Sequence, residues 1–139
     1  MPVLAEIEWQ GQTRRVVMVG NRNGFFYVLD RVTGELLLGT PFSSTTWARE
    51  LDADGRPIVL NDGSQGCLPD PWGSTNFMPP TFYPGLDLFI LTARETCSTY
   101  VPEEPANVEG QANFGGTAMI DPEGSGALRA HRWSRFLWP

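Results

Sequence analysis

The sequence contains one histidine (His131) and two cysteines (Cys67 and Cys97), with no Cys-x-x-Cys pair. A zinc site needs about four such ligands, so this scarcity argues against one. The two cysteines alone leave three possibilities open: a disulfide, two free thiols, or half of a metal site.

Lysine is absent altogether, and the ten basic residues are arginines scattered along the chain. They form no basic stripe, and the net charge at pH 7 is −6. Both features exclude the electrostatic footprint of a nucleic-acid-binding protein.

Long apolar runs are missing as well. No stretch approaches the roughly 18 apolar residues of a membrane-spanning helix, so no membrane segment is expected. The opening "MPVLAEIEWQ" has neither the basic nor the apolar region of a signal peptide, and none is expected in this sequence. Apolar spacing of 3.6 residues is not sustained anywhere, which predicts little helix.

Turn-forming residues are plentiful, with 15 glycines and 12 prolines among 139 residues. They indicate short elements joined by many turns. The length suits one small domain, and 41% hydrophobic residues with 19% charged residues is typical of a globular chain.

The first 42 residues predict four short strands joined by turns. Asn21 to Gly24 is a hairpin turn signal, and Gly34 suits a positive φ in the following turn. Such a meander has the size of one propeller blade. The predicted strands are "LAEIEW" (4–9), "RRVVMV" (14–19), "GFFYVLD" (24–30) and "ELLLGTPF" (35–42).

The second half predicts a less regular blade-like unit, 43–125, containing a long loop at 62–80. A loop of that length in a small domain is functional or counts against the assignment. Residues 126–139 are expected to start a further strand and end in a divergent tail. The strands predicted here are 56–61, 86–95, 96–102 and 126–133, with "TFYPG" (81–85) leading into the second.

The predicted fold class is therefore all-β, with antiparallel four-stranded blades of a partial β-propeller, about two to three blades. A propeller ring needs about four blades or more, so this chain would leave open sheet edges. We expect it to be part of a longer protein or to self-associate through those edges.

Several ordered motifs resemble the pyrroloquinoline quinone (PQQ) dependent alcohol dehydrogenases. "NRNGFFYVLDRVTGELL" (21–37) is similar to a blade segment of that family. The similarity covers roughly residues 12–130. It continues through "TTWA" (45–48), "DGRPI" (54–58), "GCLPDPWGSTNFMPPTFYP" (66–84), "LFILTARETCSTY" (88–100) and "GGTAMIDPEGSGALRA" (115–130).

The resemblance implies an eight-bladed propeller of the periplasm that carries PQQ and calcium and oxidises alcohols. The family's catalytic Asp and its calcium ligands have no matching motif here, so no catalytic or metal residue is assigned. There is also no Cys-x-x-Cys-His motif for a haem. We therefore expect the chain to be inactive alone. The alternative is a non-catalytic binding or assembly module.

Three positions match the family's cofactor-binding residues. The resemblance places Arg22 against the ortho-quinone oxygens, Asn76 in a hydrogen bond to the cofactor, and Phe77 beside them. It also implies that Cys67 and Cys97 form a disulfide. The plainer alternatives are a solvated turn arginine, an Asx turn at Asn76 and two buried thiols.

Overall fold

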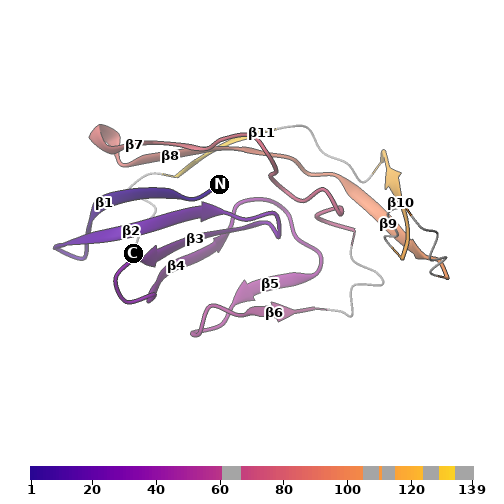
Figure 1. The fold of residues 1–139 in the computed structure, drawn as a ribbon, viewed down its shortest axis with the longest axis horizontal. Helices are drawn as coiled ribbons and strands as arrows, with labels where there is room; N and C mark the ends of the chain where they lie inside the picture. The colour runs from indigo at the N-terminus through magenta and orange to yellow at the C-terminus, as the bar shows by residue number, and fades with distance from the viewer. Residues whose placement is uncertain (61–66, 105–109, 111–114, 124–128, 134–139) are drawn as a thin grey trace.

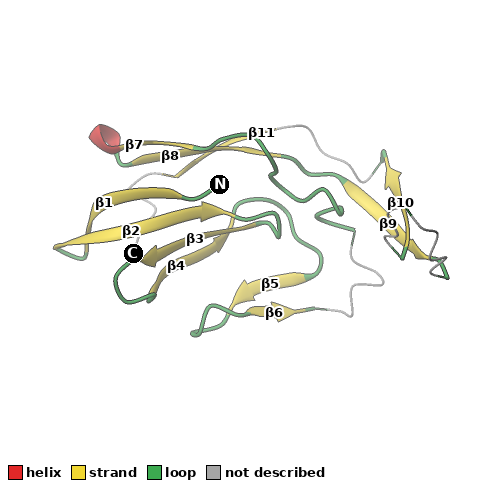
Figure 2. Ribbon diagram, in the orientation of Figure 1, coloured by secondary structure: helices red, strands yellow, loops and turns green. Residues whose placement is uncertain are grey.

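The computed structural model describes residues 1–60, 67–104, 110, 115–123 and 129–133. This part of the chain is built of antiparallel strands (Figure 1), which confirms the predicted all-β class. Its helical structure is a single 3-10 turn, η1 (Pro84–Leu86), drawn in red in Figure 2. Within these ranges, no helix has the length and apolar character needed to span a membrane.

The first sheet is a meander in which each strand pairs with the next along the chain. Alternate side chains are buried along much of its first three strands, the pattern of a sheet with one packed face. This sheet confirms the four strands predicted before residue 42. In chain order they are β1 (Val3–Trp9), β2 (Gln12–Gly20), β3 (Phe25–Asp30) and β4 (Leu36–Pro41).

Asp30 shapes the turn between β3 and β4. Its Oδ1 accepts hydrogen bonds from the N–H groups of Val32 (2.8 Å) and Thr33 (3.2 Å), and Arg14 Nη1 lies 3.0 Å from its Oδ2. These contacts, led by the Val32 N–H, lower the pKa of Asp30 below its usual 3.8, although burial acts in the opposite direction. Gly34 then turns the chain into β4 with a φ of 81°, as predicted.

The second sheet contains β7 (Thr81–Tyr83), β8 (Leu88–Ala93) and β11 (Arg129–Trp133), in the order β11-β8-β7. Figure 1 shows it as a second layer beside β1 to β4. Phe26 and Phe89 meet between the layers, with ring centroids 4.8 Å apart. The core between the sheets contains Ile7, Trp9, Val16, Met18, Phe26, Val28, Phe42, Phe89, Leu91 and Ala93.

Two hairpins accompany the sheets. One joins β5 (Ala48–Leu51) to β6 (Pro57–Val59), and the other joins β9 (Cys97–Pro102) to β10 (Gly116–Asp121). The sequence did not predict strands at β5, β7 or β10. In Figure 1 the β9–β10 hairpin lies at the far end of the molecule from η1.

The final strand, β11, pairs with β8, so residues 129–133 extend the sheet that holds β7 and β8. The division into units 1–42, 43–125 and 126–139 stays a prediction. The tail residues 134–139 lie outside the described part of the chain.

Candidate functional site

The turn 21–24, between β2 and β3, contacts the loop 67–80 that precedes β7. The Ser74 N–H donates to the Arg22 carbonyl (2.9 Å). The Ser74 hydroxyl group also lies 2.5 Å from that of Ser43, which follows β4. Ser74 is almost fully buried. We refer to turn 21–24 and loop 67–80 together as the site loops.

Two asparagines fix the backbone on either side of Arg22. Asn21 Oδ1 accepts the N–H of Asn23 (3.1 Å), and Asn23 Oδ1 accepts the N–H of Phe25 (3.0 Å). Gly24 has a φ of 94°, and a Cβ there would lie 2.6 Å from Thr45 Cγ2. The turn is therefore closed by Asx-type hydrogen bonds, and glycine is strongly favoured at its last position.

Arg22 projects from this turn and is exposed. Its Nη2 donates a 2.5 Å hydrogen bond to the carbonyl oxygen of Pro71, so the side chain is tied to loop 67–80. The simple picture of a solvated turn arginine omits this contact. The side chain borders an open groove of about 440 Å³, lined by Arg22, Pro71, Trp72, Tyr100, Gly116 and Ala118.

Asn76 lies on the same loop and is half-buried. Its Nδ2 donates to the carbonyl oxygen of Trp72 (3.1 Å), the residue after the one that receives Arg22. The structure thus brings Arg22 and Asn76, 54 positions apart in sequence, to two consecutive carbonyl groups. Phe77 is 81% exposed and points away from the core. Cofactor binding by these three residues stays a prediction.

The sequence did not predict the ion pair between Asp70, in loop 67–80, and Arg94. Asp70 has a side chain only 1% exposed, and Arg94 Nη2 lies 3.0 Å from its Oδ2. The Asp70 Oδ1 also accepts the N–H groups of Trp72 (3.0 Å) and Gly73 (3.1 Å). The pattern Asp-x-x-Gly marks a turn here, but nothing in the sequence connects it with Arg94, 24 residues later.

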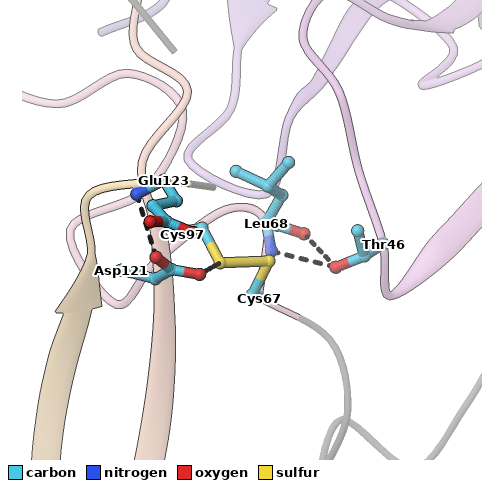
Figure 3. Close-up of a disulfide and its surroundings, with 6 residues drawn as sticks. All are labelled: Thr46, Cys67, Leu68, Cys97, Asp121 and Glu123. Carbon is cyan, nitrogen blue, oxygen red and sulfur yellow. Dashed lines mark hydrogen bonds between the residues drawn. A yellow bond between two sulfur atoms is a disulfide. The ribbon is translucent and has the colours of Figure 1, made fainter. Parts of the chain in front are cut away.

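Cys67 and Cys97 form a disulfide, the pairing that the resemblance implied, with Cα atoms 4.6 Å apart. The bond ties the start of loop 67–80 to the first residue of β9. In Figure 3, Asp121 lies beside the Cys97 sulfur, with Oδ2 3.9 Å away. On the other side Leu68 exchanges hydrogen bonds with Thr46, whose Oγ1 accepts the Leu68 N–H at 2.9 Å.

Among the residues that the structure describes, no three His, Cys, Asp or Glu side chains gather as they would around a metal ion. Arg22 and Asn76 both donate hydrogen bonds through their side-chain N–H groups. This arrangement can bind carbonyl or anionic oxygen atoms.

No protein-family model matches the chain. Several curated proteins, however, are similar to it in sequence. A quinohemoprotein alcohol dehydrogenase of Comamonas testosteroni is 37% identical over 97 residues, covering 66% of this chain and 14% of the relative. The quinohemoprotein alcohol dehydrogenase ADH-IIG of Pseudomonas putida is 31% identical over 147 residues, covering 95% and 20%. A lanthanide-dependent methanol dehydrogenase of Methylorubrum extorquens is 30% identical over 137 residues, covering 86% and 23%.

Solved structures agree with these relatives. A europium-containing methanol dehydrogenase superposes with a TM-score of 0.84 at 26% identity, over 94% of this chain and 25% of that chain. The quinohemoprotein alcohol dehydrogenase from Comamonas testosteroni gives a TM-score of 0.65 at 26% identity, over 94% and 24%. This chain spans a fifth to a quarter of the length of most of these proteins. It belongs, as a partial segment, to the family of PQQ-dependent quinoprotein alcohol and methanol dehydrogenases.

Proposed function

We propose that this chain is the segment of an alcohol-oxidising quinoprotein that supplies Arg22 and Asn76 to PQQ. The observation that supports this most is their convergence on the Pro71 and Trp72 carbonyls. The two residues that the resemblance selects come from different loops, and the fold brings their loops together.

The donor chemistry of these residues fits an ortho-quinone. A guanidinium has five N–H donors in a rigid fork and stays charged at every physiological pH. In the described part of the chain, Arg22 uses Nη2 on Pro71, and the exposed side chain has further N–H groups that can face a ligand. Asn76 adds an amide, which can donate or accept, on the same loop.

Arg22 has an electrostatic role in this proposal. PQQ, when bound, accepts the two electrons that are removed from the alcohol. A cation held next to the quinone oxygens stabilises negative charge there, and a fixed donor does so without having to reorganise. The hydrogen bond to Pro71 restricts the guanidinium and so keeps it in place. Phe77, largely exposed, is the third residue that the resemblance selects, next to Asn76 in the sequence.

The remaining catalytic parts would come from elsewhere in a full-length protein. The resemblance assigns neither the base nor the calcium ligands to residues of this chain. We therefore propose that the chain alone does not oxidise alcohols. The disulfide between Cys67 and Cys97 supports placement in an oxidising compartment such as the periplasm.

A PQQ titration of the purified chain tests this proposal. Tryptophan emission, corrected for absorption by PQQ, would be followed with and without Ca²⁺. We expect saturable binding whose affinity does not depend on Ca²⁺, because the calcium ligands are not assigned here. The absence of saturable binding would refute the proposal that this segment supplies Arg22 and Asn76 to a PQQ site.

One observation favours the alternative, a non-catalytic assembly module. Leu4 pairs with Val17, Val17 with Leu29, and Val19 with Tyr27, so these side chains share the sheet face opposite the core. Leu4 is 64% exposed and the other four are half-buried. A second copy of the chain could cover such an apolar face. Sedimentation equilibrium decides, since a monomer at about 100 μM would exclude tight self-association.

A further inference from the structure

Asp70 is a buried carboxylate that is surrounded by donors. Its Oδ1 receives the N–H groups of Trp72 (3.0 Å) and Gly73 (3.1 Å), and its two oxygens face the guanidinium of Arg94 at 3.4 and 3.0 Å. A buried charge needs such partners, because an unpaired one is strongly unfavourable. The proposed function assigns no role to this pair.

The turn that Asp70 closes carries the two carbonyl groups of the site. Gly73 N–H also donates to the Asp70 carbonyl (2.8 Å), so residues 70–73 form one hydrogen-bonded turn. Within it, the Pro71 carbonyl receives Arg22 and the Trp72 carbonyl receives Asn76. The direction of both carbonyls depends on the conformation that Asp70 holds.

Arg94 connects this turn to the second sheet. Its backbone N–H donates to the Ser74 carbonyl (2.8 Å), and its Nη2 also donates to Thr96 Oγ1 (3.1 Å). The Asp70 N–H donates to the Thr96 carbonyl (3.0 Å). Loop 67–80 is therefore fixed to the end of β8 and the segment before β9 at several points close to Asp70.

The turn also packs tightly on the backbone of Arg22. Gly73 has a φ of 82°, and a Cβ there would lie 2.6 Å from Arg22 Cβ and 2.8 Å from Arg22 O. A shift of residues 70–73 must therefore displace Arg22 or break the hydrogen bond from the Ser74 N–H to the Arg22 carbonyl.

We propose that Asp70 is a positioning residue: through the turn 70–73, the Asp70–Arg94 pair holds the Arg22 guanidinium in the orientation that meets the quinone. The part that concerns PQQ rests on the proposed function. The part that concerns the orientation of Arg22 does not, and it is measurable without a cofactor.

The test compares Asp70→Asn with Glu50→Gln in the whole chain. Glu50 forms an exposed ion pair with Arg49 and is the matched control. NMR would follow the guanidinium N–H groups of Arg22 and hydrogen exchange at the Trp72 and Gly73 amides. Because a hydrogen bond to a charged group is among the stronger ones, we expect about ten- to hundredfold faster exchange at all three places in Asp70→Asn. We expect no change in Glu50→Gln.

PQQ titrations of the same variants give the second readout. Asp70→Asn should weaken binding about tenfold, and the Asp70→Asn/Arg22→Ala double variant should bind about as weakly as Arg22→Ala alone, because both act through one contact. If the Trp72 and Gly73 amides exchange faster while the Arg22 guanidinium is unchanged, Asp70 is only structural and the inference is wrong.

Two further outcomes are informative. If the wild-type chain binds no PQQ but Asp70→Asn still releases Arg22, the proposed function fails and the positioning role stands. If Asp70→Asn does not fold, Arg94→Lys takes its place: it keeps the positive charge but loses the bidentate fork. Unchanged Arg22 signals in a folded Arg94→Lys variant would then overturn the inference.

Discussion

Replacement of Gly24 by alanine should destabilise the chain more than replacement of Gly34, although both glycines have a positive φ (94° and 81°). A left-handed backbone costs an L-residue about 1–2 kcal/mol, which applies to both variants. The loss of unfolded-state entropy on changing Gly to Ala is also common to both. The difference between the variants therefore isolates what surrounds each new Cβ.

The surroundings differ sharply. A Cβ at Gly34 meets no atom within 4 Å, whereas a Cβ at Gly24 would lie 2.6 Å from Thr45 Cγ2 and 3.2 Å from Ser43 Oγ. Thr45 is not free to rotate away, since its Oγ1 donates to the Ala48 carbonyl (2.6 Å). Forced overpacking of this kind costs about 1–3 kcal/mol. We therefore expect a loss of about 1–2 kcal/mol for Gly34→Ala and about 2–5 kcal/mol for Gly24→Ala.

Urea unfolding followed by tryptophan fluorescence measures both losses by linear extrapolation. The double variant Gly24→Ala/Thr45→Ser provides a rescue, because it removes Cγ2 and keeps the hydroxyl group. It should recover part of the stability lost in Gly24→Ala. Equal losses in Gly24→Ala and Gly34→Ala, or no recovery in the double variant, would refute the close packing of turn 21–24.

Two further predictions concern stability. Removing the disulfide with Cys67→Ser/Cys97→Ser should lower the free energy of unfolding by about 3–4 kcal/mol on the chain-entropy model, for a sequence separation of 30 residues; a loss below about 1 kcal/mol in urea unfolding would show that the surrounding hydrogen bonds suffice. Because folding lowers the pKa of Asp30, its ionised carboxylate contributes to the stability of the folded chain. This contribution is fully present above the unfolded-state pKa near 3.8 and is lost as the pH falls through the lower folded-state pKa. Asp30→Asn should therefore lose stability at neutral pH and flatten the pH dependence below about pH 4, and an unchanged acid limb in chemical denaturation would contradict this.

Local patterns predicted the first sheet well. The short apolar and β-branched runs of β1 to β3 and the turn signals at Asn21 to Gly24 and at Gly34 act between near neighbours, so the sequence displays them directly. The resemblance, and not the pattern, selected Arg22 and Asn76. No local signal shows that their loops touch, because the contacts join residues about 50 positions apart.

The features that the sequence did not predict are either short or dependent on distant partners. β5 is four residues long and contains Arg49 and Glu50, so its apolar pattern is too short to read. β10 pairs with β9 across a long connection. Asp70 resembled an ordinary turn aspartate, and its burial depends on Arg94, which lies directly after β8. Burial and partner choice at such positions are tertiary properties.

We propose that Arg22 faces PQQ in a full-length protein. The most direct test is a PQQ titration of Arg22→Ala beside Arg49→Ala, a variant of an exposed arginine in a local ion pair. Loss of a charge-assisted contact should weaken binding about ten- to hundredfold in Arg22→Ala, and Arg49→Ala should bind like the wild type. Equal affinities for the wild type and Arg22→Ala would show that Arg22 does not contact PQQ.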